Sequence, residues 1–260
     1  MSIVGMSGVD LSNFDLVVKA GEEVERADVT GLVAVLNGGK LRADTVTGRL
    51  FVYEGGQATI GEVTTDDNPG MIGSMMRGGV DLLGRATIGK VHSGGHVWVS
   101  GVADATIGEV SGAESRVVLS EGGHATIGEV FGEAIVTVET STKAVIGEIR
   151  GQGKAIVKGR ATITKVFDEG CVEVGGHVGV GTVIDYGRVD VELGGEAGIG
   201  KVSRKGRLRV CRGAQATVGD LFDKGIVTTW SAEVTILKAH EGGVVDGGDE
   251  NVVTIVEDLR

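Results

Sequence analysis

Short runs of alternating apolar and polar residues return along the chain at a nearly fixed interval. One run has the form Ala-Thr-Ile-Gly-Glu-Val, as in residues Ala125–Val130, with apolar residues at its first, third and sixth places. Copies of this unit begin at residues 24, 41, 58, 86, 105, 125, 144, 161, 178, 197, 216 and 234. Successive copies start 17 to 20 residues apart, apart from one step of 28, so the sequence predicts a repeat architecture.

A second alternating run precedes each copy. Its two apolar residues usually stand eight and six places before the copy, as Val117 and Leu119 stand before Ala125. Glycine suits tight bends with positive φ, and pairs of glycines separate the two runs in many repeats. These pairs are Gly38-Gly39, Gly55-Gly56, Gly122-Gly123, Gly175-Gly176 and Gly194-Gly195.

Alternation with a period of two, rich in β-branched residues and broken by glycine, is typical of β-strands. A helix is disfavoured because each interior glycine would cost about 1 kcal/mol. We therefore predict an all-β fold, a single-stranded parallel β-helix (β-solenoid) of about twelve coils of 17–20 residues. Residues such as Ile127 and Ile146 should point into its core.

The repeat also predicts how the chain is divided. Residues 1–15 are expected to form an N-terminal cap, residues 16–239 the β-solenoid, and residues 240–260 a C-terminal cap or a last coil. Val252–Val256 is the candidate for a last strand. Caps are expected because the end of a solenoid is an open strand edge that invites aggregation.

The 28-residue step predicts a loop, over residues 64–79, inserted into the solenoid. It holds the only proline and three of the five methionines. Flexible methionines make adaptable contact surfaces, so Met71, Ile72, Met75 and Met76 are the candidate partner-contact residues. The alternative is that this loop folds over one sheet or over the N-terminal end.

Composition narrows the range of functions. With 47 glycines, one proline and 3% aromatic residues among 260, the chain is not collagen, and 41% hydrophobic residues suffice for a core. A net charge of -11 without a linear run of basic residues disfavours nucleic acid and anionic lipid as partners. Neither a signal peptide nor an apolar stretch of membrane-spanning length is visible, so we expect no membrane insertion and a cytoplasmic or particle-associated location.

The combination of Gly-Gly corner, short alternating strand and threonine-containing unit resembles the repeats of AIDA-type autotransporter passengers over roughly residues 16–239. That resemblance implies a right-handed parallel β-helix of the adhesin kind. Such passengers carry an export signal and a membrane anchor, so a passenger fragment or a virus-type fibre protein is the expected form. The bare solenoid is also similar to bactofilins, cytoplasmic β-helices that polymerise end to end.

Few residues of the sequence suggest a binding or catalytic site. Threonines recur at the second place of the unit and could order water, although they also suit a strand ladder. Glu109, Glu129 and Glu148 recur at the fifth place, where a hard cation could relieve their repulsion, but a solvated edge explains them better. His124 and His177 share a column, yet Lys143 and Arg160 lie between them. We expect no metal, cofactor or disulfide.

No grouping of serine, histidine and aspartate, phosphate-binding loop or zinc spacing is visible. The sequence therefore predicts a non-enzymatic structural or binding rod, adhesin-like or virion-fibre-like, that works in a homo-oligomer or a larger particle. The alternatives are a bactofilin-like polymer, which would form end-to-end filaments, and a carbohydrate-active β-helix enzyme. The enzyme would need carboxylates that converge across coils.

Overall fold

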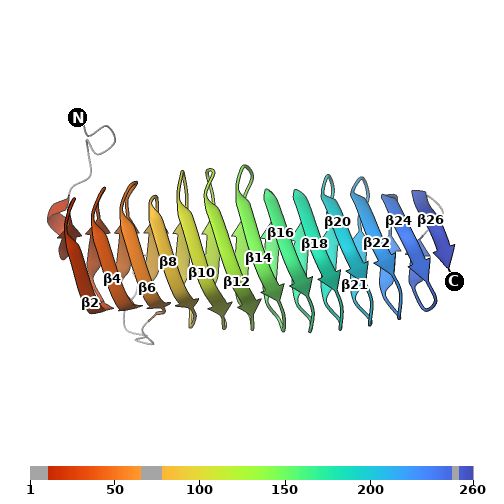
Figure 1. Cartoon of the computed structure of the whole chain (residues 1–260), viewed down its shortest axis with the longest axis horizontal. Coiled ribbons are helices and arrows are strands. Elements are labelled where there is room, and N and C mark those ends of the chain that lie inside the picture. The colour runs from red at the N-terminus through yellow and green to blue at the C-terminus, as the bar shows by residue number, and fades with distance from the viewer. Residues whose placement is uncertain (1–10, 66–77, 248–251, 260) are drawn as a thin grey trace.

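The chain folds into an elongated stack of β-coils, given by a computed structural model that describes residues 11–65, 78–247 and 252–259 (Figure 1). Within these residues the strands form two 13-stranded parallel sheets, in which each strand pairs with the strand two places away in the chain. Sheet A consists of β1 (Leu16–Val18), β3 (Leu32–Val35), β5 (Arg49–Val52), β7 (Gly79–Leu82), β9 (His96–Val99), β11 (Arg116–Leu119), β13 (Ile135–Val138), β15 (Lys154–Val157), β17 (Cys171–Val174), β19 (Arg188–Val191), β21 (Arg207–Val210), β23 (Ile226–Thr229) and β25 (Val244–Gly247).

Sheet B carries the six-residue units. It consists of β2 (Glu23–Val29), β4 (Lys40–Val46), β6 (Gln57–Val63), β8 (Arg85–Val91), β10 (Asp104–Ser111), β12 (His124–Phe131), β14 (Lys143–Ile149), β16 (Arg160–Val166), β18 (His177–Val183), β20 (Glu196–Val202), β22 (Gln215–Leu221), β24 (Glu233–His240) and β26 (Val252–Leu259). The one helical turn among the described residues is the 3₁₀ segment η1, Leu11–Asn13.

The register places equivalent residues of successive units directly above one another. Ile107 pairs with Ile127, and Ile127 pairs with Ile146. The same rule holds in sheet A, where Val97 pairs with Val117. Because each apolar place stacks on itself, the valines, isoleucines and leucines of both sheets form one continuous core along the stack. The predicted β-solenoid, with its inward Ile127 and Ile146, is confirmed.

Corner glycines let successive coils approach closely. A Cβ added to Gly123 would lie 2.5 Å from the carbonyl oxygen of Val99, and one added to Gly195 would lie 2.3 Å from that of Val174. Real Cβ atoms do not come this close to backbone oxygens. The preceding residue, Gly194, instead adopts a φ of +76°, which glycine reaches at no steric cost. In the pair Gly194-Gly195, glycine therefore serves a positive φ at the first position and a close approach to the neighbouring coil at the second.

The 28-residue step leaves the stack intact. β7 pairs with both β5 and β9, so sheet A continues across it. In the chain, the extra residues of this step fall between β6 of sheet B and β7 of sheet A.

The two ends of the stack differ. At the first coil, Asp15 accepts a hydrogen bond from the backbone N–H of Leu32 at 2.7 Å, and Phe14 packs edge-on against Phe51. At the last coil, β25 and β26 lie at the opposite end of the rod (Figure 1), and Val252 and Val256 of β26 are 61% and 66% exposed. Among the described strands, none pairs with the outer edge of β26, and this edge is partly apolar.

Candidate binding groove

The outer face of sheet B carries two parallel columns of side chains. One column, here called the polar column, contains the first residue of each sheet-B strand, and the second, the threonine column, contains the residue two places later. Between them runs a column of alanines or valines that point inward. The alanines of this middle column keep 4% to 6% of their surface exposed, whereas the isoleucines beside them keep 2% or less.

A groove follows the middle column over β14 to β24. It encloses about 860 Å³ and is bordered by the polar column from Lys143 to Glu233 on one side and by the threonine column from Val145 to Thr235 on the other. A second hollow of about 440 Å³ continues it over β10 to β14 and shares Lys143 with it. Because both hollows share residues of β14, they form one channel along the rod.

Two glycines widen the groove. Gly179 and Gly198 occupy the threonine column in consecutive coils, where threonine stands in most other repeats. A Cβ added to either would meet nothing within 4 Å, and neither has a positive φ. Neither steric crowding nor backbone conformation therefore requires glycine here, in contrast to Gly195. The effect of the two glycines is a notch in one border of the groove.

The polar column brings four basic side chains together beside the groove. His124 pairs in register with Lys143, Lys143 with Arg160, and Arg160 with His177. The two histidines have acidic neighbours, since His124 Nδ1 lies 3.8 Å from an Asp104 carboxylate oxygen and His177 Nδ1 lies 2.8 Å from one of Glu196. In the part of the chain that the structure describes, no carboxylate lies within ion-pair distance of Lys143 or Arg160.

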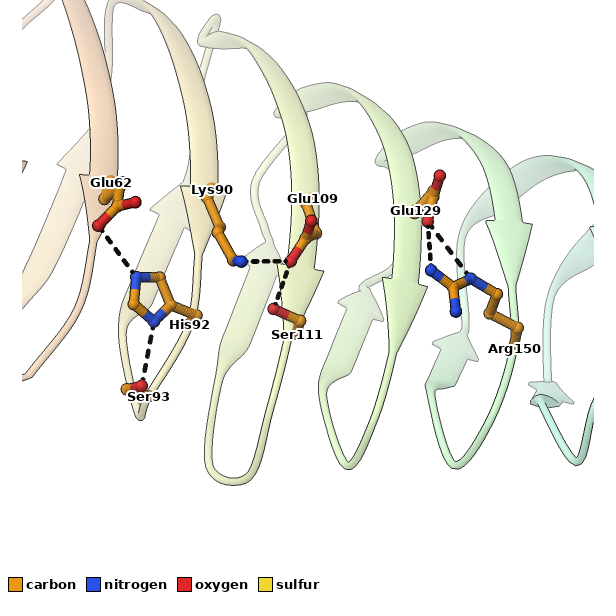
Figure 2. A network of polar contacts seen from close by, with 8 residues as sticks. All are labelled: Glu62, Lys90, His92, Ser93, Glu109, Ser111, Glu129 and Arg150. Atoms are coloured by element: carbon orange, nitrogen blue, oxygen red, sulfur yellow. Dashed lines mark hydrogen bonds and ion pairs between the residues drawn. The ribbon is translucent and has the colours of Figure 1, made fainter.

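In the fifth-place column, beyond the groove, several charged side chains are held by a neighbour of opposite charge (Figure 2). Lys90 Nζ lies 3.0 Å from Glu109, and the Ser111 hydroxyl donates to the same carboxylate oxygen at 2.7 Å. Partial burial alone would raise the pKa of Glu109, but the hydrogen bonds from Ser111 and Lys90 outweigh it and hold this pKa below its ordinary value of 4.5.

Glu129 and Glu62 of that column are also held by neighbours. Arg150 donates to Glu129 at 2.9 Å while its guanidinium lies over the Phe131 ring, and His92 Nε2 lies 3.3 Å from Glu62 (Figure 2). For Glu109 and Glu129, neighbouring cationic side chains thus relieve the repulsion between the carboxylates, which a bound metal cation could also have relieved.

The outer face of sheet A has its own closed pairs. Arg188 donates to Asp190 through Nε at 2.8 Å, its Nη2 lies 2.6 Å from the other carboxylate oxygen, and Asp190 is only 4% exposed. Lys154 lies 2.7 Å from Glu173. Burial, followed by the Asp190 carboxylate, raises the pKa of the neighbouring Cys171 thiol. A raised pKa keeps this thiol protonated and poorly nucleophilic.

The predicted partner-contact residues Met71, Ile72, Met75 and Met76 lie outside the described residues. His124 and His177 are kept apart by Lys143 and Arg160, as the repeat predicted. The threonine column is interrupted by Val145, Gly179 and Gly198. Both cysteines are free thiols, in agreement with the expectation of no disulfide.

Neither the basic run nor the groove was predicted from the sequence. The four basic residues are 17 to 19 residues apart along the chain and meet only through the register. Their shared column was visible in the repeat. The overlooked signal was that no acidic residue interrupts the column from His124 to His177.

Two general features complete the description of the site. The described residues contain no group of three or more histidine, cysteine, aspartate or glutamate side chains placed to hold a metal ion. Over the same residues, no helix has the length and apolar character needed to cross a membrane.

Comparisons with known proteins show a similarity of structure. No protein-family model and no curated protein matches the sequence. A solved structure, that of a TibC-catalysed, hyper-glycosylated TibA fragment, is similar with a TM-score of 0.69 and 20% sequence identity. The alignment covers 94% of this chain and 93% of that chain. At this identity the comparison shows that the two chains share the parallel β-solenoid fold.

Proposed function

We propose that this protein is a non-enzymatic structural rod that binds a partner along the outer face of sheet B. The observation that carries the proposal is the groove of about 860 Å³, bordered by Lys143 and Arg160, two cations that have no acidic partner among the described residues. Elsewhere on the rod, polar side chains such as those of Glu109 and Asp190 are engaged by neighbours in ways that support the stack. The groove is the feature that the stack itself does not use.

The adhesin-like or fibre-like part of the proposal rests on the fold. Stacked parallel coils give a stiff, extended surface, and solenoids use such surfaces for binding. In the similar solved structure, TibA is the protein that is glycosylated and TibC is the catalyst. A solenoid of this shape that is the glycosylated protein, with another protein as the catalyst, supports a structural role for the present chain.

We further propose that the rod works in a closed homo-oligomer, with Met71, Ile72, Met75 and Met76 among the contacts. Light scattering on a sizing column should give a discrete dimer or trimer for the intact chain and a monomer after deletion of residues 66–76. A discrete oligomer unaffected by the deletion would remove these four residues from the interface. A monomer in both cases would refute the oligomer.

A second candidate is an end-to-end polymer of the bactofilin kind. It is favoured by the uncovered edge of β26, where Val252 and Val256 are more than half exposed. Exposed strand edges pair readily with other chains. Open-ended species of growing mass in the same light-scattering experiment would support this candidate over a closed oligomer. Substitution of Val256 by lysine should then shorten the species, because charged edge residues oppose strand pairing.

The enzyme alternative has a direct test. A carbohydrate-active enzyme would shorten a glycan on prolonged incubation, which sizing chromatography of the glycan detects. We expect the chain length of the glycan to stay constant. Any progressive shortening that a Glu196→Gln or Glu233→Gln variant abolishes would overturn the non-enzymatic assignment.

A further inference from the structure

We infer that the groove binds an anionic glycan, one whose carboxylate or sulfate groups lie along the rod and contact Lys143 and Arg160. The inference rests on the proposed binding function and names the chemical class of its ligand. It is carried by the two cations without acidic partners, the notch at Gly179 and Gly198, and the hydrogen-bonding groups of the groove borders.

The charge distribution selects an anion. Lys143 and Arg160 stand in register on neighbouring strands, about 4.8 Å apart along the stack. Like charges directly opposite each other destabilise a sheet. Among the described residues, no carboxylate compensates the repulsion between Lys143 and Arg160. In the same column, Lys40 and Arg85 face Glu23 and Asp104. A bound anion would supply the missing counter-charge.

The extent of the basic run limits the length of anionic ligand that it can hold. The run covers four coils and ends at Asp104 on one side and Glu196 on the other, on a protein of net charge -11. A nucleic acid strand longer than this run would continue its phosphates into these acidic flanks, whereas a short acidic oligosaccharide would not. Single-stranded nucleic acids are also held by aromatic side chains that stack on bases, and the residues lining the groove include no phenylalanine, tyrosine or tryptophan.

The uncharged part of the groove suits sugar rings. Gly179 and Gly198 leave the backbone of two consecutive coils open, with nothing within 4 Å of the position that a side chain would take. Thr162 and Thr217 border the notch, and Gln215 lies in the polar column on β22, the strand that carries Thr217. Hydroxyl and amide groups of this kind donate to and accept from the hydroxyls of a sugar.

The test measures binding of glycan probes to the intact protein by biolayer interferometry. The probes are oligogalacturonate, which carries carboxylates, heparin oligosaccharide, which carries sulfates as well, neutral dextran, and oligothymidylate as a nucleic acid. We expect at least one of the two acidic glycans to bind, and dextran and oligothymidylate to bind at least about tenfold more weakly. Preference between the acidic glycans identifies the anionic group.

Two double variants and a matched control variant locate the site. Lys143→Gln/Arg160→Gln removes the unpartnered cations and should weaken acidic-glycan binding by about tenfold or more. The control Lys40→Gln/Arg85→Gln makes the same substitutions in the same column, outside the groove, with the same change in net charge; we expect a change of less than about twofold. Gly179→Thr/Gly198→Thr fills the notch at positions with room for a side chain and should weaken binding without loss of folding.

Several results would overturn the inference. They are failure of both acidic glycans to bind, equal losses in the groove and control variants, or oligothymidylate binding as tightly as the glycans. The outcome is separable from that of the proposed function. A glycan that binds but is shortened would refute the non-enzymatic role and leave the groove assignment standing. A stable oligomer that binds no glycan would refute the groove assignment and leave the structural role standing.

Discussion

Individual side chains in each strand alternate between two environments, and the sequence pattern follows that alternation. Ile127 is 1% exposed, whereas its neighbour Thr126 lies on the outer face. Because the period is two, the position within the unit decides whether a residue belongs to the core or to the surface. A single substitution can therefore have a large effect at an inward position and a negligible effect at an outward one.

Ile127→Asp should unfold the protein. The variant buries a carboxylate among apolar side chains without a partner, which we expect to cost more than about 4 kcal/mol. Ile127→Val should cost about 0.5–1.5 kcal/mol, and the surface control Thr126→Val less than about 0.5 kcal/mol. Circular dichroism during thermal unfolding measures all three. Toleration of the aspartate would contradict the inward assignment of this column.

Glu109 should make stability depend on pH. Its pKa in the folded state is lowered, so its contribution is present above the ordinary pKa of 4.5 and is lost as the pH falls through the folded value. Ser111→Ala removes one hydrogen bond that lowers this pKa. We expect it to cost about 1 kcal/mol at pH 7 and less at about pH 3, in urea unfolding. An equal cost at both pH values would remove Glu109 from the explanation.

Strands and corners depend on the contact between one coil and the next. Gly195 has no room for a Cβ against the Val174 carbonyl, whereas Gly198, three residues later on the outer face of β20, has open space around it. The same residue type thus has a steric role at the corner and none on the strand.

Gly195→Ala should destabilise the protein by more than about 2 kcal/mol, because the backbone of two coils must separate. Gly198→Ala should be neutral or stabilise by about 0.4–1 kcal/mol, since it restricts only the unfolded chain. Urea unfolding of the two variants gives the comparison. Equal effects of the two substitutions would show that the close approach at the corner does not limit the stack.

The strands could be predicted from the sequence because their signal is local and repeated. Apolar places at fixed positions of a unit, with glycine corners between runs, specify strand, parity and register together. The groove could not be predicted in the same way. It depends on which side chains are absent, at Gly179 and Gly198, and on which charges of different coils lack partners, such as Lys143 and Arg160. These properties arise only when the strands of different coils are stacked side by side.

Across the full rod, stability should fall toward the C-terminal end. Asp258 of β26 occupies the sixth place of the unit, where β24 has Ala239 and earlier units have valine, isoleucine or leucine, and most of β25 and β26 is exposed. In a stack, an end coil has one neighbour, and an inner coil has two.

Hydrogen exchange followed by mass spectrometry should therefore find peptides of β25 and β26 exchanging faster than those of β12 and β14. Slower exchange at the C-terminal end in the isolated protein would show that this edge is covered. That result would favour the end-to-end polymer.

The binding role of the groove implies that Lys143 and Arg160 do not serve the stack. The decisive measurement is the free energy of unfolding of Lys143→Gln/Arg160→Gln, beside Lys90→Gln, which breaks the 3.0 Å pair with Glu109. We predict that the groove variant is as stable as the natural protein, or more stable by about 0.2–0.5 kcal/mol through relief of like-charge repulsion, while Lys90→Gln loses about 0.2–1 kcal/mol. A loss of more than about 1 kcal/mol in the groove variant would assign both cations to the support of the coils and contradict a binding surface there.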